Sequence, residues 1–335
     1  MARSVPMLRK AAMALIASTI WASPAPAQDF PRTLNIYVGY GPGGGYDTNA
    51  RLVGRFLGKY LPGEPNVVVQ NMPGAGGLKA ANWLYELAPR DGSAIAITGT
   101  ALFLEPLLGG KEAHFDSQKF TWLGSTATEP AGCAVWHTAN IKTMEELLTR
   151  PLLVGGSGQA AVATIYPMAM NAVLGAKLKL IQGYTGSNES LLAMERGEVQ
   201  VFCGFTPYAR PNWLKEGKVT VVAQIGMTRD RSFPDAPLVQ DYASNAEDRQ
   251  VLEFIFAQQS VTRPYLGPPG IPAARTKALR DGLARTVADS QFREEAAKMR
   301  VDPVFMTGED IAALLRKLYA SPPQVVARAK TIMGR

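Results

Sequence analysis

The stretch that decides the fold is LNIYVGYGPGGGYD, residues 34–47. In its first half, Leu34, Ile36 and Val38 alternate with other residues, which is the two-residue period of a strand. After the three consecutive glycines, apolar residues recur with a helical period. Glycine has no Cβ, so the backbone N–H groups that open the helix can approach an anion. The stretch therefore predicts a strand, an anion-binding loop and a helix; an ordinary strand–helix turn is the alternative.

A second loop of the same kind follows. The apolar run NVVVQ, residues 66–70, is typical of a buried parallel strand, and NMPGAGG, residues 71–77, continues it as a glycine-rich loop before another helical pattern. Parallel strands that neighbour one another end at the same edge of a sheet, where open α/β sheets bind ligands. Two such loops side by side favour a binding site over two unrelated turns.

The first 27 residues have the pattern of a secretory signal peptide. Basic residues at positions 3, 9 and 10 precede an apolar run over 11–21, and Ala25 and Ala27 supply the small residues before a cleavage point. The apolar run is shorter than the roughly 20 residues that a bilayer span needs. We therefore expect cleavage after Ala27 and a mature chain in the periplasm.

Length and charge narrow the class of protein. A chain of 335 residues, 47% hydrophobic and 19% charged, is long enough for two globular domains. Loss of the predicted signal peptide removes three basic residues and no acidic one, so the formal charge falls from +7 to +4. The remaining basic residues are scattered, which argues against a nucleic-acid partner. Cys133 and Cys203 can oxidise in an exported chain, but the sequence leaves their pairing open.

The glycines at 39, 41 and 44 also satisfy G-x-G-x-x-G, so an exported nucleotide- or NAD-binding enzyme is the alternative hypothesis. That motif needs an acidic ribose partner at the end of the second strand, where Gln70 and Asn71 stand. A phosphate-binding P-loop needs Lys-Ser/Thr after its last glycine, where Tyr46 and Asp47 stand. Neither nucleotide motif is therefore the leading interpretation.

Catalytic and metal patterns are weaker still. The stretch GGSGQ, residues 155–159, lacks the final glycine of a nucleophile elbow, and the chain has only two histidines. It has no Cys-x-x-Cys and no His-Glu-x-x-His pattern for zinc. We predict a chain that is not an enzyme, with no cofactor and no metal site.

The rest of the chain repeats the alternation of strands and helices. Strands are predicted at 152–155, 178–181, 199–203 and 219–224, with loops at 156–160 and 183–187 that open helices. Three pairs have the spacing of helix-capping residues: Thr143 with Glu146, Ser244 with Glu247, and Thr307 with Asp310.

The chain resembles the Bug family, the extracytoplasmic substrate-binding proteins associated with tripartite tricarboxylate transporters. The resemblance covers the whole mature chain, and its most specific motif is VVVQNMPGAGG, residues 67–77. Other matching stretches are GGGYD (43–47), APRDG (88–92), YTGS (184–187), GEV (197–199), FPDAP (233–237) and GPPGIP (267–272). The resemblance implies an α/β, two-domain type II periplasmic binding protein, a Venus flytrap that closes on a small carboxylate without doing chemistry.

Under this resemblance residues 28–128 and 258–335 form the first domain, and residues 129–257 form the second. The matching motifs imply ligand contacts at Gly43, Gly44, Gly45, Tyr46, Asp47, Pro73, Gly74, Ala75, Gly76, Gly77, Thr98, Thr100, Ala101, Ser157, Gly158, Tyr184 and Ser187, with Tyr40, Gly204 and Phe205 beside them. An Asp47–Arg51 salt pair is the plainer role for Asp47. The chain departs from the family at Gly41-Pro42, at Tyr46 and at Gly204.

The departure at Gly204 bears on the ligand. Many family members have an aspartate there, so this chain has no evident partner for an amine, while Tyr40, Tyr46, Tyr184 and Phe205 can form apolar walls. We expect a mono- or dicarboxylate with an apolar or aromatic body, bound by a monomer that serves the permease of such a transporter.

Overall fold

The computed structural model describes Met1 and residues 30–127, 129–157, 161–184, 186–299 and 301–334. Residues 2–27 of the predicted signal peptide and the predicted site residue Gly158 lie outside the described residues. Within those residues, no helix has the length and apolar character that crossing a membrane requires.

The first sheet has the strand order β11 (Met306–Thr307), β4 (Thr121–Ala127), β10 (Thr262–Gly267), β3 (Ala94–Ile97), β1 (Thr33–Val38) and β2 (Asn66–Asn71). β1 is parallel to both β2 and β3, whereas β10 runs antiparallel to β3 and β4. Leu34, Ile36 and Val38 are all fully buried, which confirms the alternation predicted for β1.

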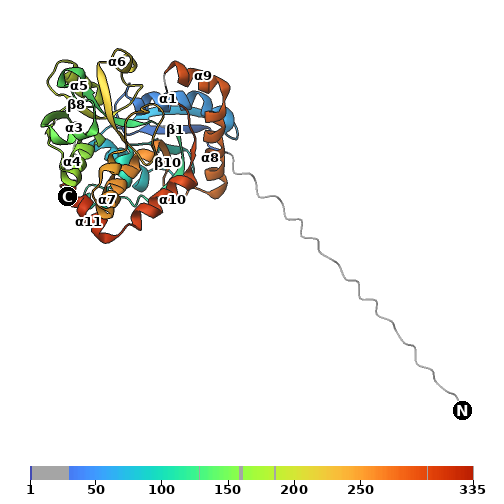
Figure 1. The fold of residues 1–335 in the computed structure, drawn as a ribbon. Helices are drawn as coiled ribbons and strands as arrows, with labels where there is room; N and C mark the ends of the chain where they lie inside the picture. The colour runs from blue at the N-terminus through green and yellow to red at the C-terminus, as the bar shows by residue number, and fades with distance from the viewer. Residues whose placement is uncertain (2–29, 128, 158–160, 185, 300, 335) are drawn as a thin grey trace.

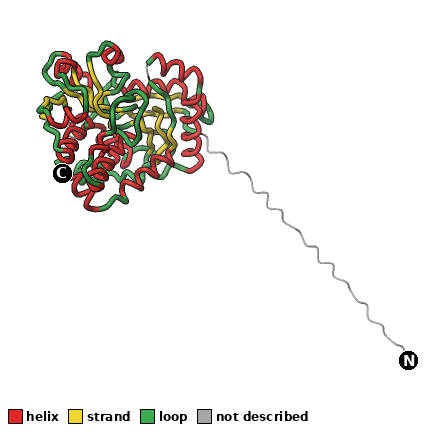
Figure 2. The backbone as a smooth tube through the Cα atoms, viewed as in Figure 1, coloured by secondary structure: helices red, strands yellow, loops and turns green. Residues whose placement is uncertain are grey.

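Helices cover both faces of this sheet. Ile95 and Ile97 of β3 pack with α1 (Gly45–Leu57), α8 (Ala273–Ala288) and α9 (Ser290–Lys298). The alternate residues Ala94 and Ala96 pack with α2 (Leu78–Glu86) and α10 (Gly308–Tyr319). Successive strand residues point to opposite faces, so the first domain is a sheet between two helical layers, as Figures 1 and 2 show.

The second sheet has the order β7 (Leu178–Ile181), β6 (Leu152–Gly155), β8 (Val201–Phe205), β5 (Ala131–Trp136) and β9 (Val219–Ile225). One face packs with α3 (Met144–Thr149), α4 (Val162–Leu174) and α7 (Ala246–Phe256). The other packs with α5 (Ser187–Glu195) and α6 (Pro211–Lys215). The predicted fold class, α/β with two domains, is confirmed.

Cys133 and Cys203 form a disulfide across paired strands of the second domain. They lie directly opposite each other in the antiparallel register of β5 and β8, and both are fully buried. The sequence left this pairing open because strand register cannot be read from two isolated cysteines.

The predicted division places the passages of the chain between the domains at two points. The first lies between β4 and β5, at Glu129, and the second follows the short helix Ala257–Ser260 that leads into β10. The C-terminal helix α11 (Pro323–Ile332) adds a third, because its buried residues Val325 and Ala329 pack with α4 and α7 of the second domain. The expected boundaries assigned all of residues 258–335 to the first domain, whereas α11 lies beside α7 (Figure 1).

Two of the three predicted capping pairs are confirmed. Thr143 accepts a hydrogen bond from the Glu146 N–H, and Thr307 accepts one from the Asp310 N–H. The third was wrong by one residue, since Asn245 rather than Ser244 caps α7 and accepts from the Asp248 N–H. Both residues have side chains suited to that position, so sequence spacing alone did not separate them.

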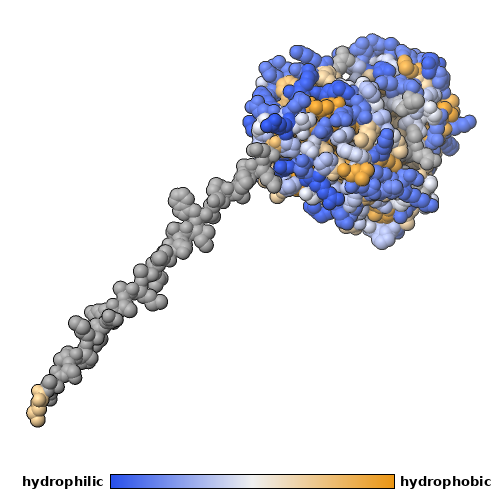
Figure 3. All heavy atoms as spheres, turned by 180° about the vertical axis from the view of Figure 1, so that it is seen from behind, coloured by the Kyte–Doolittle hydropathy of each residue, from blue (hydrophilic) through white to orange (hydrophobic). Residues whose placement is uncertain are grey.

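The outer surface is mainly hydrophilic. On the face in Figure 3, hydrophilic residues cover most of the area and apolar ones are scattered among them. The large apolar side chains exposed within the described residues, apart from Met1, are Leu87, Leu192 and Val304.

Candidate functional site

The first glycine loop follows β1 and opens α1, as predicted, and Asp47 holds it in shape. The Asp47 carboxylate accepts hydrogen bonds from the Gly43 N–H and from Arg51 Nε, both at 2.9 Å, and its side chain is only 4% exposed. Burial would raise the pKa of Asp47, but the hydrogen bonds from Arg51, Gly43 and Asn71 outweigh it and lower that pKa to about 2. Asp47 therefore stays ionised and turned toward its own loop.

Asn71 joins the first loop to the second. Its Nδ2 donates to Asp47 Oδ1 at 2.8 Å and to the Tyr40 carbonyl at 3.0 Å, while its Oδ1 accepts from Arg51 Nη2 at 3.0 Å. The sequence interpretation placed Asn71 in the second loop and used it to argue against a nucleotide site. Its role in holding the two loops together was missed.

The second loop turns sharply through left-handed backbone. Gly74, Ala75, Gly76 and Gly77 have φ angles of 151, 46, 67 and 100°. A Cβ on Gly39, at the end of the first strand, would lie 3.0 Å from the Cα of Gly77, so the two loops touch through their backbones. The glycines are needed for this contact, and the predicted placement of the two loops side by side is confirmed.

Two tyrosines fill the space beside the loops. The rings of Tyr40 and Tyr46 stack with centroids 4.6 Å apart, and the Tyr40 hydroxyl donates to the Gly76 carbonyl at 3.0 Å. A Cβ at Gly99 would clash with that hydroxyl, which explains the glycine after β3. Burial raises the pKa of both tyrosines, so their hydroxyls remain neutral donors at ordinary pH. Next to Gly99, the predicted residues Thr98 and Thr100 are buried and Ala101 is half-buried.

A cation that the sequence interpretation missed lies against the first loop. Arg263, in β10, is stacked on the Tyr46 ring with its guanidinium carbon 4.4 Å from the centroid. A Cβ on Gly45 would lie 2.5 Å from Arg263 Nη2, so the guanidinium occupies the side of Gly45 that a side chain would fill. Arg263 Nη2 also forms a salt bridge with Glu129 Oε1 at 2.6 Å, and both side chains are mostly buried, at 15% and 17% exposure.

The Arg263–Glu129 pair extends into a hydrogen-bond chain that reaches the second domain. Gln259 Nε2 donates to the Glu129 carbonyl at 2.8 Å, and the Tyr166 hydroxyl, from α4, donates to Gln259 Oε1 at 2.9 Å. Glu129 and Gln259 lie on the two connections between the domains. Burial, and to a smaller extent the Tyr46 hydroxyl, raise the pKa of Tyr166.

The predicted second-domain contacts lie at or beyond the carboxyl ends of three neighbouring parallel strands, β6, β7 and β8. Tyr184 is half-buried and donates to Glu198 at 3.3 Å, and Ser187 is exposed at the start of α5. The Ser157 carbonyl accepts from the Thr164 hydroxyl at 3.2 Å. Gly204 has a φ of 114°, which residues other than glycine rarely adopt. Phe205 is fully buried and packs near Phe233, so the structure places it in the core of the second domain.

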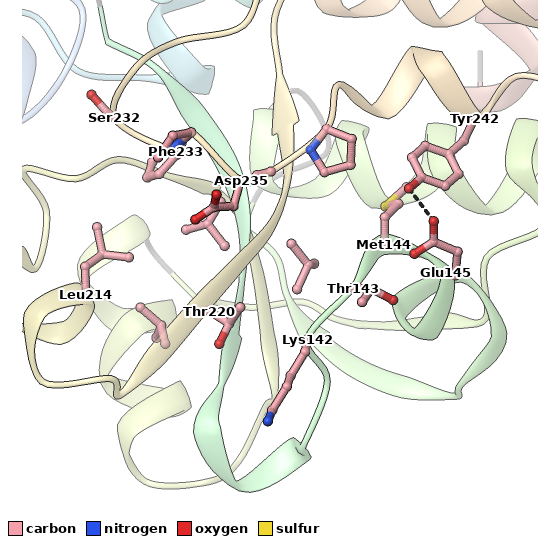
Figure 4. Close-up of a pocket in the computed structure, with 16 residues that line it drawn as sticks. Lys142, Thr143, Met144, Glu145, Leu214, Thr220, Ser232, Phe233, Asp235 and Tyr242 are labelled. Carbon is pink, nitrogen blue, oxygen red and sulfur yellow. Dashed lines mark hydrogen bonds between the residues drawn. The ribbon is translucent and has the colours of Figure 1, made fainter.

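An open groove of about 550 Å³ lies elsewhere, along the outer edge of β9 (Figure 4). Its walls include Thr220, Phe233 and Asp235, and at one end Tyr242 donates to Glu145 at 2.6 Å. None of the predicted site residues lines it. Among the described residues, no group of three or more His, Cys, Asp or Glu side chains is placed to bind a metal ion.

The family model described as "Tripartite tricarboxylate transporter family receptor" matches residues 50–328. The chain belongs to this family. This match confirms the predicted resemblance to the Bug family. It also confirms the prediction that the protein is a receptor rather than an enzyme.

Related proteins cover nearly the whole receptor. A protein of Cupriavidus necator, described as "UPF0065 protein in gbd 5'region", is 26% identical over 311 residues, which are 90% of this chain and 89% of that protein. The periplasmic binding protein BugD superposes with a TM-score of 0.68 at 19% identity, covering 90% of this chain and 97% of BugD.

Two related structures were solved with organic acids. A protein of R. palustris solved with adipate has a TM-score of 0.68 and 18% identity, covering 89% of this chain and 97% of its own. MatC from Rhodopseudomonas palustris, solved with bound malate, has a TM-score of 0.63 and 20% identity, covering 90% and 98%. At these identities the likeness shows the type II binding-protein fold.

Proposed function

We propose that this receptor binds a small organic carboxylate, outside the cytoplasm, and delivers it to a tripartite tricarboxylate-type permease. The observation that carries the proposal is the contact between two glycine loops at the carboxyl ends of β1 and β2. Both loops open helices, whose first-turn N–H groups have no partner within the helix and favour an anion.

The site takes its shape from both domains. Gly43, Gly44 and Gly45 are exposed, and so are Pro73, Gly74, Ala75 and Gly76 of the second loop. Tyr40 and Tyr46 supply an apolar wall beside them. Closure of the second domain would bring Tyr184 and Ser187 toward the same ligand, and the two connections near Glu129 and Gln259 supply the hinge.

The relatives solved with adipate and malate support this chemical class, although their sequences differ too much to transfer the acid itself. Gly204 leaves no carboxylate at the position where many relatives have one, so a ligand with an amine finds no evident counter-ion there. We infer a mono- or dicarboxylate with an apolar or aromatic body, bound by a monomer.

The direct test is thermal denaturation of the mature protein, residues 28–335, against a panel of aliphatic and aromatic mono- and dicarboxylates that includes adipate and malate. An acid at 100 times its dissociation constant should add about 2.7 kcal/mol of stability. For a protein of this size that is a rise in melting temperature of about 5 °C. NAD and ATP serve as controls and should give no shift; a shift with either nucleotide and none with the acids would overturn the proposal.

A further inference from the structure

Arg263 occupies an unusual position for a charged strand residue. Its side chain is mostly buried, and its backbone φ is +54°, in the left-handed region that non-glycine residues rarely adopt. The hydroxyl of Tyr265, two residues along β10, donates to the buried Asn49 of α1 at 2.9 Å. That bond fixes the strand against α1, and the strained backbone directs Arg263 to the glycine loop.

The positive charge of Arg263 lies at the end of α1 where the helix dipole disfavours a cation. The N-terminus of α1 is the positive end of its dipole, so a guanidinium against Gly45 is unfavourable unless an anion lies between them or beside them. Glu129 supplies that anion here. Burial would lower the pKa of Arg263, but the Glu129 carboxylate and the neighbouring tyrosines outweigh it and raise that pKa, so the cation persists.

A guanidinium has five N–H donors in a fork that fits a carboxylate at two points. The salt bridge to Glu129 joins Nη2 to one carboxylate oxygen, and the Tyr46 side chain is a second partner of the guanidinium, which leaves further N–H donors for another acceptor. Arg263 and the first turn of α1 thus converge on the same small volume, and both attract a carboxylate.

We propose that Arg263 binds the carboxylate of the ligand and that Glu129 is its resident counter-ion, which the ligand replaces. This inference rests on the proposed function and names the side chain that determines its charge preference. A one-for-one exchange of carboxylates keeps the buried cation neutralised throughout. It also releases the Glu129 side chain, which belongs to the first connection between the domains, while its carbonyl stays bonded to Gln259 on the second.

The test is a double-mutant cycle measured by isothermal titration with the acid that gives the largest thermal shift in the panel. Arg263→Gln should weaken binding by tenfold or more, since a charged hydrogen bond is lost. Glu129→Gln should tighten binding several-fold, because the competing carboxylate is gone. In a protein that already carries Arg263→Gln, adding Glu129→Gln should not increase the affinity, because the effect of Glu129→Gln depends on Arg263.

Arg263→Gln leaves the Glu129 charge buried without a partner, so this variant is the one at risk of misfolding. The double variant removes both charges and keeps the cycle measurable, and Arg263→Lys retains the charge without the fork. Glu253→Gln is the matched control, because Glu253 forms an exposed salt bridge with Arg249 on α7 and should leave binding unchanged.

The outcomes separate the two proposals. If no acid in the panel binds the wild-type protein, the proposed function fails and this inference fails with it. If an acid binds the wild type and Arg263→Gln binds it equally well, the inference alone is overturned. The exchange of carboxylates is also excluded if the Glu129→Gln variant binds the acid no more tightly than wild type. It is excluded as well if Glu129→Gln tightens binding in a protein that lacks Arg263.

Discussion

Asn71 donates a hydrogen bond to Asp47 across the boundary between the two glycine loops, over 2.8 Å. Because Asp47 in turn holds the Gly43 N–H, one amide side chain ties the end of β2 to the loop that opens α1. The relative position of the two loops therefore depends on side chains as well as on backbone.

We predict that Asn71→Ala costs about 1–3 kcal/mol of stability, since it leaves buried oxygens of Asp47 and Tyr40 without their donor. Urea unfolding measures this loss, and the same variant should bind acids more weakly. Gln70→Ala is the control, because the Gln70 side chain donates to Asn35 on an exposed surface, and its cost should stay within about 0.5 kcal/mol. Equal costs for the two variants would contradict the role given to Asn71.

The depressed pKa of Asp47 predicts a pH dependence of definite sign. Its pKa falls from 3.8 to about 2 on folding, so the unfolded chain takes up this proton first as the pH is lowered. The stabilisation, on the order of 2 kcal/mol, is fully present above about pH 5 and is lost as the pH falls toward 2. Urea unfolding of wild type and Asp47→Asn from pH 6 to pH 3 should show their stabilities converging at low pH; a constant difference would refute the assignment.

Gly44→Asp separates anion binding from folding. Gly44 is the N-cap of α1 and a Cβ there would meet only the Gly41 carbonyl, at 3.7 Å, so the unliganded protein should be as stable as wild type or more stable by up to about 1 kcal/mol. The new carboxylate should repel the ligand and weaken binding by more than tenfold. Gly44→Asn has nearly the same shape without the charge and should retain binding. If both variants bind acids equally, the carboxylate does not approach this loop.

Loss of the disulfide should lower the stability of the protein substantially. Cys133 and Cys203 are separated by 70 residues, and closing such a loop is worth about 4 kcal/mol in the chain-entropy model. The double variant Cys133→Ala, Cys203→Ala should therefore melt several degrees lower. Thiol titration of the denatured, unreduced protein should find no free thiol from this pair; two thiols per chain would show that the bond does not form.

Local signals in the sequence predicted what local chemistry determines. Glycine runs after Val38 and Asn71 marked the two loops, since glycine adopts positive φ at a lower cost than other residues. Apolar alternation marked the strands. The salt bridge of Arg263 with Glu129 was not predictable in this way, because it joins a strand near the end of the chain to the connection that follows β4. No period or spacing links such residues.

The same limit applies to the last helix. No motif in the sequence indicated which domain packs against α11. The family resemblance implied that residues 258–335 belong to the first domain, whereas Val325 and Ala329 pack with α4 and α7.

This arrangement of α11 makes the C-terminal end of the described chain a reporter of domain motion. A fluorophore on the exposed Thr331 of α11 travels with the second domain, whereas one on the exposed Lys298 of α9 travels with the first. A pair of dyes at these two positions, far from the glycine loops in sequence, would change its energy-transfer efficiency when an acid closes the domains.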